Sequence, residues 1–394
     1  IRTAASVPAF HGICQPIIDQ PEVGILGFIV RPSAAGREWL VQAKAEPGNV
    51  GEVHLAPSVQ ATRSNYMRVH GGAATPYIDR FIAPGQGDTV VRDSLQSEHG
   101  NRFLGKYNSN VTLLSGDGGP APHSADWRWV AAAELRAMLT ADFAVNTDAR
   151  SVLFCSDWSL LADGAPFGRW RGGCDWRAGL PGSFEAAAAE DEMDVLEWLD
   201  WERRRIDLEV GTVALESMPD WEITGDGIVR RADGQALIRA YAVEASSREV
   251  GSWDQPFYLG GQVEEVVQLC QQRDGVLRFL VRASIEAGFR ERVQVGPSWQ
   301  SDDLAGGEPP ARLIAESIRR GRERMATLQS DEGGRFFHSV CRYRIVEVPA
   351  DRDLPGVMPS HAWLTLGQIS RLSTIQGVFT NEARSVFSML LAEV

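Results

Sequence analysis

The stretch WLVQAKAEPGNVGEVHLAPSVQ, from Trp39 to Gln60, returns in altered form as FLVRASIEAGFRERVQVGPSWQ, from Phe279 to Gln300. Nine of the 22 aligned residues are identical, whereas unrelated segments of average composition match at about one or two positions. Other phrases recur in the same order: CQPII as DQPFY, LQSEHGNRF as LQSDEGGRF, and NTDARSV as TNEARSV. Self-similarity of this length predicts two copies of one domain rather than a solenoid of short repeats.

Each copy has the pattern of a mixed α+β unit. VGILGFIVR and REWLVQAKA are β-rich runs with a polar turn between them, and AAAELRAML has apolar residues at helical spacing. Between the copies lies a segment rich in Trp and Gly that ends in an Ala- and Glu-rich helix candidate. We therefore predict an α+β fold with a first unit at 1–155, a connector at 156–206 and a second unit at 207–394.

The two copies differ at their beginnings. The second starts with an arm at about residues 207–240, and the counterpart of this arm at the 240-residue shift would lie before residue 1. We expect that the sequence starts inside its first unit, that an edge strand is exposed there, and that activity depends on whether this arm is needed.

The composition of the chain limits which binding partners and which cellular location we expect. The formal net charge of −13 opposes broad attraction to nucleic acid or anionic membranes, so an anionic ligand needs a local basic pocket. The five cysteines are odd in number and never form a CxxC pair, which disfavours a disulfide framework and predicts a reducing, cytoplasmic location. No apolar run has the length of a membrane span.

Motifs of common cofactor and metal chemistry are absent. The sequence has no GxGxxG after a strand, no GxxxxGK[ST], no HExxH, no EF-hand loop and no GxSxG. Its seven histidines show no ligand spacing. We therefore expect neither a cofactor nor a catalytic metal.

Comparison of the copies separates scaffold from chemistry. Apolar positions such as Leu40 and Val41 persist as Leu280 and Val281, which is typical of a shared core. Charged and amide residues diverge: Lys44, Asn49 and Lys106 become Ser284, Phe289 and Ser339. The phrase ATRSNYMRVH after Gln60, which supplies Arg63, Asn65, Tyr66 and His70, is replaced by SDDLAGG. These residues are candidates for gripping an anion, with a solvated turn as the alternative interpretation.

Some polar residues occur in both copies. Glu46, Gln60 and Arg102 recur as Glu286, Gln300 and Arg335, and Glu98 becomes Asp331. Such retention fits turns and caps as well as catalysis. Arg150, which recurs as Arg384 in the shared ARSV, is expected to be a structural ion-pair partner.

The phrases QPIIDQPEVGILGFIV, QAKAEPGN, PSVQATRSNY, VHGG and LQSEHGNRF together resemble the NDP-hexose 2,3-dehydratases of deoxysugar and antibiotic biosynthesis. The resemblance implies two Nudix-like units that arose by duplication, usually in a homodimer. It implies dTDP-4-keto-6-deoxyglucose as substrate and a 3,4-diketo-2,6-dideoxy sugar nucleotide as product, which a partner 3-ketoreductase then reduces.

This chemistry needs an acid, a base and an anion site. The C4 ketone acidifies the C3 proton, a base removes it, the C2 hydroxyl leaves with help from an acid, and the enol becomes a ketone at C3. Residue type and the comparison of the copies offer Glu46 or Glu98 as base and Tyr66 or His70 as acid. Substrate contacts are expected from Arg63, Asn65, Gln60, Arg102, Lys106 and Lys44.

Two other functions stay open. A dTDP-sugar binding protein of the same fold without turnover is the main alternative. A residual Nudix-type hydrolase is a weaker one, because the helix that would carry a REXXEE motif lacks its glutamates. The residues alone leave the choice between the two carboxylates, and the binding ability of the second unit, undecided.

Overall fold

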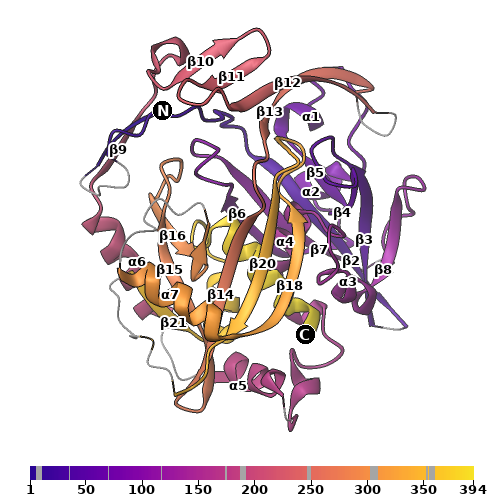
Figure 1. Cartoon of the computed structure of the whole chain (residues 1–394). Coiled ribbons are helices and arrows are strands. Elements are labelled where there is room, and N and C mark those ends of the chain that lie inside the picture. The colour runs from indigo at the N-terminus through magenta and orange to yellow at the C-terminus, as the bar shows by residue number, and fades with distance from the viewer. Residues whose placement is uncertain are drawn as a thin grey trace.

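The structure is a computed structural model that describes residues 1–5, 11–34, 36–69, 71–116, 118–173, 175–186, 192–245, 250–301, 309–351, 354 and 360–394. Two seven-stranded sheets form its framework (Figure 1). The first has the order β4 (Val53–Ala56), β3 (Gly36–Ala45), β2 (Gly24–Ser33), β7 (Tyr107–Ser115) and β6 (Asp88–Ser97), with β5 (Val59–Ala61) on β2 and β8 (Trp127–Ala131) on β3.

The second sheet repeats this order. It runs β16 (Val293–Gly296), β15 (Val276–Ile285), β14 (Glu264–Arg273), β20 (Val340–Glu347) and β18 (Arg322–Ser330), with β17 (Trp299–Gln300) on β14 and β21 (His361–Leu364) on β15. Strands β2 and β7 are parallel, and so are β14 and β20. The predicted α+β class is confirmed, and the two copies share one strand topology. The Nudix-like fold of each unit and the boundaries between the units stay predictions.

The central strand β2 shows why its sequence is apolar on both faces. Phe28 and Val30 belong to the main core together with residues of helix α4 (Thr147–Cys155), whereas Ile29 packs beside Phe81 of helix α2 (Ile78–Ile82). Successive strand residues point to opposite faces. Both faces of β2 are therefore covered by helices.

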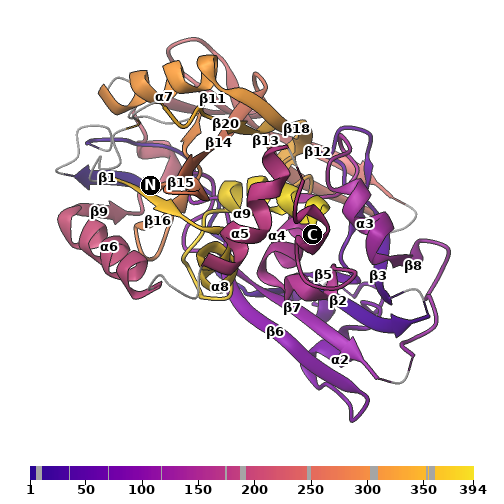
Figure 2. The same cartoon turned by 90° about the horizontal axis from the view of Figure 1, so that it is seen from below.

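Helices α4 and α9 (Asn381–Ser388) lie side by side between the sheets (Figure 2). Helix α4 packs on β2 and β7, and α9 packs on β14 and β20. The order of layers is sheet, helix, helix, sheet. Each helix starts at a polar cap: the Asn146 side chain accepts from the Ala149 N–H at 2.9 Å, and the Thr380 hydroxyl from the Ala383 N–H at 3.1 Å.

The paired arginines Arg150 and Arg384 join these helices, and the expected ion pairs are absent from the contacts of the described residues. Each guanidinium is fully buried and donates to backbone carbonyls, Arg384 to Phe379 O at 2.6 Å and Arg150 to Leu139 O at 2.9 Å. Arg384 also donates to the hydroxyl of Ser151 in the other helix at 2.7 Å. Backbone carbonyl oxygens thus take the place of carboxylates as partners of these arginines.

The remaining helices surround these layers. Helix α1 (Arg63–Tyr66) follows β5, α3 (Ala132–Met138) follows β8, α7 (Pro309–Arg320) precedes β18, and α8 (Leu366–Leu372) follows β21. The predicted connector carries α5 (Gly179–Glu185) and α6 (Glu192–Arg205); residues 187–191, in the middle of the predicted acidic helix, lie outside the described part. Trp158, Phe167 and Leu180 of this segment belong to the main core.

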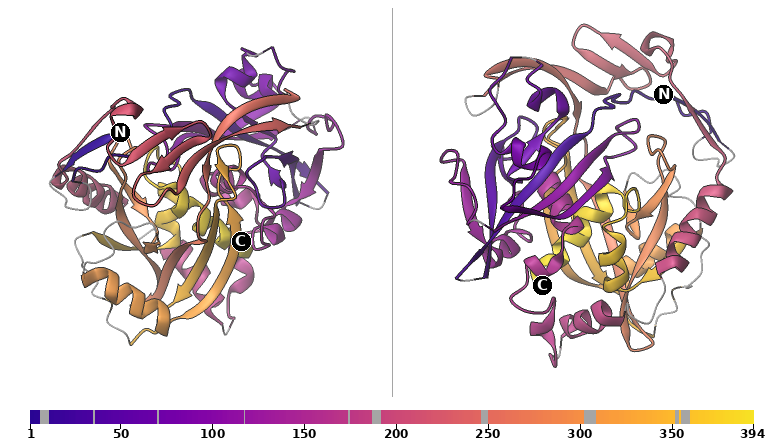
Figure 3. Two further views of the ribbon diagram at one scale, coloured as in Figure 1. Left: turned by 45° about the horizontal axis from the view of Figure 1, so that its top comes forward. Right: turned by 180° about the vertical axis from the view of Figure 1, so that it is seen from behind.

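The arm before the second unit contacts both halves. Its first strand β9 (Leu208–Gly211) pairs with β1 (Arg2–Ala5) near the N-terminus. The strands β10 (Trp221–Thr224), β11 (Gly227–Arg230), β12 (Ala236–Glu244), β13 (Ser252–Leu259) and β19 (Phe336–Phe337) form a separate five-stranded sheet. The long β12–β13 ribbon reaches across to the first sheet (Figure 3). None of the described helices combines the length and the apolar character needed to cross a bilayer.

Candidate active site

The two units carry corresponding cavities of very different size. The cavity of the first unit has a volume of about 580 Å³, and that of the second about 20 Å³. Equivalent positions line both, in the pairs Gln60 and Gln300, Lys106 and Ser339, Asp148 and Glu382, Arg335 and Arg102, and Glu332 and His99. The two cavities are therefore copies of one site, and only the first has room for a small-molecule ligand.

Each cavity is completed by a loop from the other unit. The Gly48 N–H donates to Gly333 O at 2.8 Å, and the Gly288 N–H donates to Gly100 O at 2.7 Å. The loop after β18 thereby brings Glu332 and Arg335 of the second unit to the wall of the first cavity. The large cavity is thus built by both halves, with Trp253, Asp254 and Gln255 of β13 as a further wall.

Half of the ten residues predicted for the site line this cavity. They are Lys44, Glu46, Gln60, Asn65 and Lys106. Gln60 Nε2 donates to Glu46 Oε1 at 2.8 Å, and Gln60 Oε1 accepts from Asn146 Nδ2 at 2.9 Å. This chain of amides fixes the carboxylate of Glu46 at the end of β3, beside the first turn of α4.

Glu98 lies next to the cavity, and its contacts resemble those of a structural carboxylate. Asn108 Nδ2 donates to its Oε1 at 2.6 Å and Asn381 Nδ2 to its Oε2 at 3.1 Å. Both oxygens are occupied, and the side chain is not among those that line the cavity. Glu46 is the better placed of the two candidate bases.

The other predicted residues are placed elsewhere or lie outside the described part. Arg63 is exposed and Tyr66 packs beside Val59 and Ile78, because the short helix α1 turns Ser64 and Asn65 toward the cavity instead. Arg102 lines the small second cavity, where its Nη2 is 4.0 Å from Glu264 Oε1. Arg102 therefore lies at the second unit's cavity and not at the first, because the loops are exchanged between the units. His70 lies outside the described residues.

The charged residues that line the cavity without having been predicted include Glu22, Asp148, Glu332 and Arg335. Glu22 accepts from the Ser64 N–H at 2.6 Å, and its own carbonyl accepts from Lys106 Nζ. Burial acts to raise the pKa of Glu22, but the hydrogen bonds from Ser64 and Gln20 and the charge of Lys106 lower it overall. One signal was in the sequence, since Glu22 is replaced by Gln262 in the second copy.

The carboxyl groups that line the large cavity differ in the direction of their pKa shifts. Burial, together with the charges of Glu98 and Glu46, raises the pKa of Asp148 well above its usual range, although Lys44 and Lys106 oppose this shift. Burial and the charges of Glu98 and Asp148 likewise raise the pKa of Glu332. Burial thus favours the neutral form of Asp148 and Glu332, whereas the contacts of Glu22 favour its ionised form, and carboxyl groups shifted in opposite directions are typical of acid–base sites.

Cations line the same cavity. Lys44, Lys106 and Arg335 supply three positive side chains, and burial lowers the pKa of Lys106, with partial compensation by Glu98 and Glu332. Such groups suit a phosphate or diphosphate. Among the residues that the structure describes, no cluster of three or more His, Cys, Asp or Glu side chains is placed to hold a metal ion.

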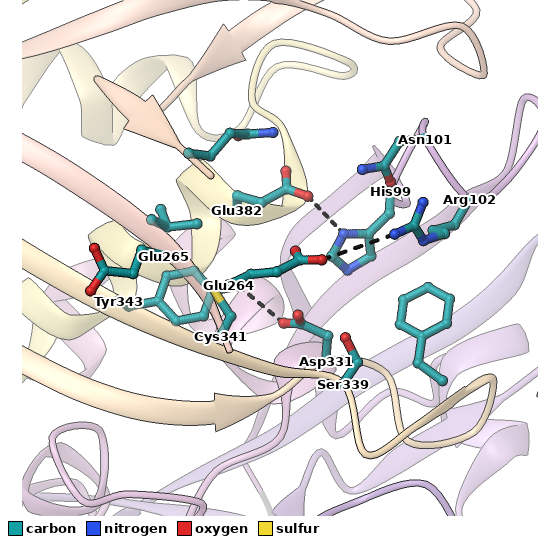
Figure 4. A pocket seen from close by; sticks show the side chains of 13 residues that line it. His99, Asn101, Arg102, Glu264, Glu265, Asp331, Ser339, Cys341, Tyr343 and Glu382 are labelled. Carbon is teal, nitrogen blue, oxygen red and sulfur yellow. Dashed lines mark hydrogen bonds and ion pairs between the residues drawn. The ribbon is translucent and has the colours of Figure 1, made fainter. Parts of the chain in front are cut away.

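The second cavity is filled by its own side chains (Figure 4). His99 Nδ1 lies 2.7 Å from Glu382 Oε1, and the Tyr343 hydroxyl donates to Asp331 Oδ1 at 3.1 Å. The positions equivalent to Lys106 and Asn110 hold Ser339 and Tyr343. The loss of a cation, the inserted aromatic ring and the internal pairing explain why so little space remains.

Comparison with known proteins agrees with this geometry. The family model for NDP-hexose 2,3-dehydratases matches residues 2–156 and 192–390. The chain is 34% identical over 392 residues to a dTDP-4-dehydro-6-deoxy-alpha-D-glucopyranose 2,3-dehydratase of Streptomyces violaceoruber, covering 95% of this chain and 82% of that protein. Proteins with the same name from Saccharopolyspora spinosa and Amycolatopsis orientalis are 33% and 32% identical, with 98% and 96% of this chain and 79% and 75% of those proteins covered. The chain belongs to the NDP-hexose 2,3-dehydratase family.

Proposed function

We propose that this protein removes water from C2 and C3 of dTDP-4-keto-6-deoxyglucose and releases dTDP-3,4-diketo-2,6-dideoxyglucose. The observation that carries the proposal is the lining of the large cavity of about 580 Å³, which combines the hydrogen-bonded carboxyl group of Glu46, the buried Asp148 with its raised pKa and three cationic side chains. Cavities of roughly 300–1,000 Å³ are typical of small-ligand sites. The names of the relatives support the same substrate and reaction.

The cavity residues suggest a division of labour. Glu46 is positioned as the base that takes the C3 proton, which the adjacent C4 ketone makes acidic. Lys44, Lys106 and Arg335 hold the diphosphate, and the indole of Trp253 on β13 offers a flat surface for thymine. Trp253 Nε1 donates to Gln255 Oε1 at 2.7 Å, which fixes the orientation of the ring.

Mass spectrometry tests the proposal directly. The protein is incubated with dTDP-4-keto-6-deoxyglucose in deuterated water without added metal or nicotinamide. Loss of one water with deuterium at C2 of the product supports elimination followed by tautomerisation. Unchanged substrate that still binds in calorimetry contradicts the dehydratase and supports the idle binding protein, whereas magnesium-dependent release of dTMP supports a hydrolase.

Three further features of this protein stay predictions. They are a homodimeric state, functional coupling to a 3-ketoreductase and a cytoplasmic location. The four described cysteines, Cys14, Cys155, Cys270 and Cys341, are buried free thiols. That state is the one expected in a reducing compartment.

A further inference from the structure

We propose that Asp148 is the catalytic general acid that gives its proton to the C2 hydroxyl as this group leaves the sugar. The assignment rests on the proposed dehydration. It concerns a residue outside the motifs by which the sequence resembles its family, and it replaces Tyr66 and His70 in the role expected from the sequence.

The placement of Asp148 is the first support. It lies in the first turn of α4, two residues after the cap Asn146, and lines the large cavity. Its residue exposure is 6%, and Lys44 and Lys106 act on its carboxyl group through their charge. Burial disfavours the charged form of a carboxyl group and therefore favours the neutral form of Asp148, which has a proton to donate.

The equivalent residue of the closed cavity provides the contrast. Glu382 occupies the same place on α9, but its Oε1 is engaged by His99 Nδ1 at 2.7 Å. That carboxyl group is ionised and internally paired, because the nearby imidazolium lowers its pKa to about 2 despite the opposing effect of burial. Asp148 has no such partner, so its proton is available to a ligand.

Other cavity groups suit the role less well. Both carboxyl oxygens of Glu46 already accept hydrogen bonds, from Gln60 and from Asn49. The Oε2 atom of Glu332 is enclosed without a partner rather than open to the cavity. Tyr66 does not line the cavity. Asp148 is therefore the neutral acid that is placed to meet the substrate.

The protons balance over one turnover. Glu46 takes the proton from C3, the C2–O bond breaks, and Asp148 protonates the departing oxygen to form water. The enol then passes its O3 proton to the Asp148 carboxylate, and Glu46 returns a proton to C2. Both side chains end in their starting states, and the substrate has lost one water without any oxidant or reductant.

A leaving group that needs no proton isolates this role. Fluoride departs from carbon unprotonated, so a dTDP-4-keto-6-deoxyglucose analogue with fluorine at C2 bypasses the acid but still needs the base. For Asp148→Asn we expect about 10²–10⁴-fold slower water loss from the natural substrate. We expect fluoride release within about threefold of wild type, and Kd for the natural substrate within about threefold. Glu46→Gln is expected to slow both reactions.

Controls separate this outcome from misfolding and from failure of the proposed function. Asp194→Asn changes an exposed aspartate in the first turns of α6 and is expected to leave both rates unchanged. Equal loss of both reactions in Asp148→Asn, or no loss of water elimination, overturns the assignment. A wild-type protein that acts on neither compound overturns the proposed dehydration and the role of Asp148 with it.

Discussion

His99 of the first unit and Glu382 of the second form a buried pair across the middle of the molecule, with Nδ1 and Oε1 2.7 Å apart. Burial disfavours the imidazolium, but Glu382, with help from Asp331 and Glu332, raises the pKa of His99 to about 10. Glu382 has its own pKa lowered to about 2. The pair is therefore ionised throughout the physiological range and holds the second cavity closed.

Glu382→Gln is expected to destabilise the fold by about 3–5 kcal/mol, because it leaves a buried imidazolium without its partner. Denaturant unfolding at neutral pH, followed by fluorescence, measures this loss. Glu393→Gln at the C-terminus, whose partners include Arg177, serves as a control for removing a carboxylate from a more exposed pair. If Glu382→Gln lowers the free energy of unfolding by less than about 1 kcal/mol, the pair does not stabilise the fold as proposed.

The same pair predicts a dependence of stability on pH. The raised pKa of His99 stabilises the fold fully below its ordinary value of 6.5, and this share is lost as pH rises to about 10. The lowered pKa of Glu382 stabilises fully above 4.5, and this share is lost as pH falls to about 2. The free energy of unfolding should thus decline from about pH 6.5 to 10 in wild type. If the free energy of unfolding of His99→Gln declines by the same amount over this pH range, the decline belongs to other groups.

Glu46→Gln and Glu98→Gln separate the base from a structural carboxylate. Glu46→Gln should lower the dehydration rate by about 10²–10⁴-fold with little change in the unfolding midpoint. Glu98→Gln should mainly lower stability, because Asn108 and Asn381 then face an amide that cannot accept from both with its two terminal groups. Single-turnover rates and thermal unfolding of both variants distinguish the two roles. If Glu98→Gln loses the dehydration rate and Glu46→Gln loses stability, Glu98 is the base.

Arg335→Met and Arg102→Met test the exchange of loops between the units. Because Arg335 lines the large cavity, its loss should weaken binding of dTDP by about 10–100-fold, the effect of one charged hydrogen-bonding group. Arg102 faces the small cavity, and its loss should leave the affinity within about twofold. Calorimetry with dTDP measures both, and the opposite ranking contradicts the exchanged arrangement.

Gly48→Ala probes the contact that carries this exchange. A Cβ atom at Gly48 would lie 1.8 Å from the carbonyl oxygen of Phe336, so the loop after β18 has to move. We expect a loss of about 1–3 kcal/mol in stability and weaker dTDP binding, because Arg335 shifts with the loop. Gly85→Ala has no atom within 4 Å of the added carbon and should change neither property.

The repeat in the sequence was sufficient to predict the α+β class and the matched strands. Period-two apolar runs specify strands, and a constant shift of 240 residues places β14, β15 and β16 on the copies of β2, β3 and β4. The same comparison also separated Lys44 and Lys106 of the open cavity from their uncharged counterparts. Local pattern and copy comparison are reliable here because strand pairing follows burial.

The alignment of the two copies could not predict which residues distant in the sequence meet in space. An alignment of the copies shows that Arg102 and Arg335 correspond, but not that each crosses to the other unit's cavity. Asp148 was overlooked because ARSV, immediately after it, reads as a helix shared by both copies. The difference between Asp148 and Glu382 is a single methylene group, and only the surroundings of each carboxyl group reveal different roles.

The exchanged loops also bear on why the chain retains both halves. A unit whose own cavity is nearly filled by its side chains has no evident ligand of its own. Here the loop that carries Glu332 and Arg335 belongs to that closed half, yet it forms a wall of the open cavity. The second half is thus needed to complete the large cavity, and we expect that the first half expressed alone would not bind dTDP.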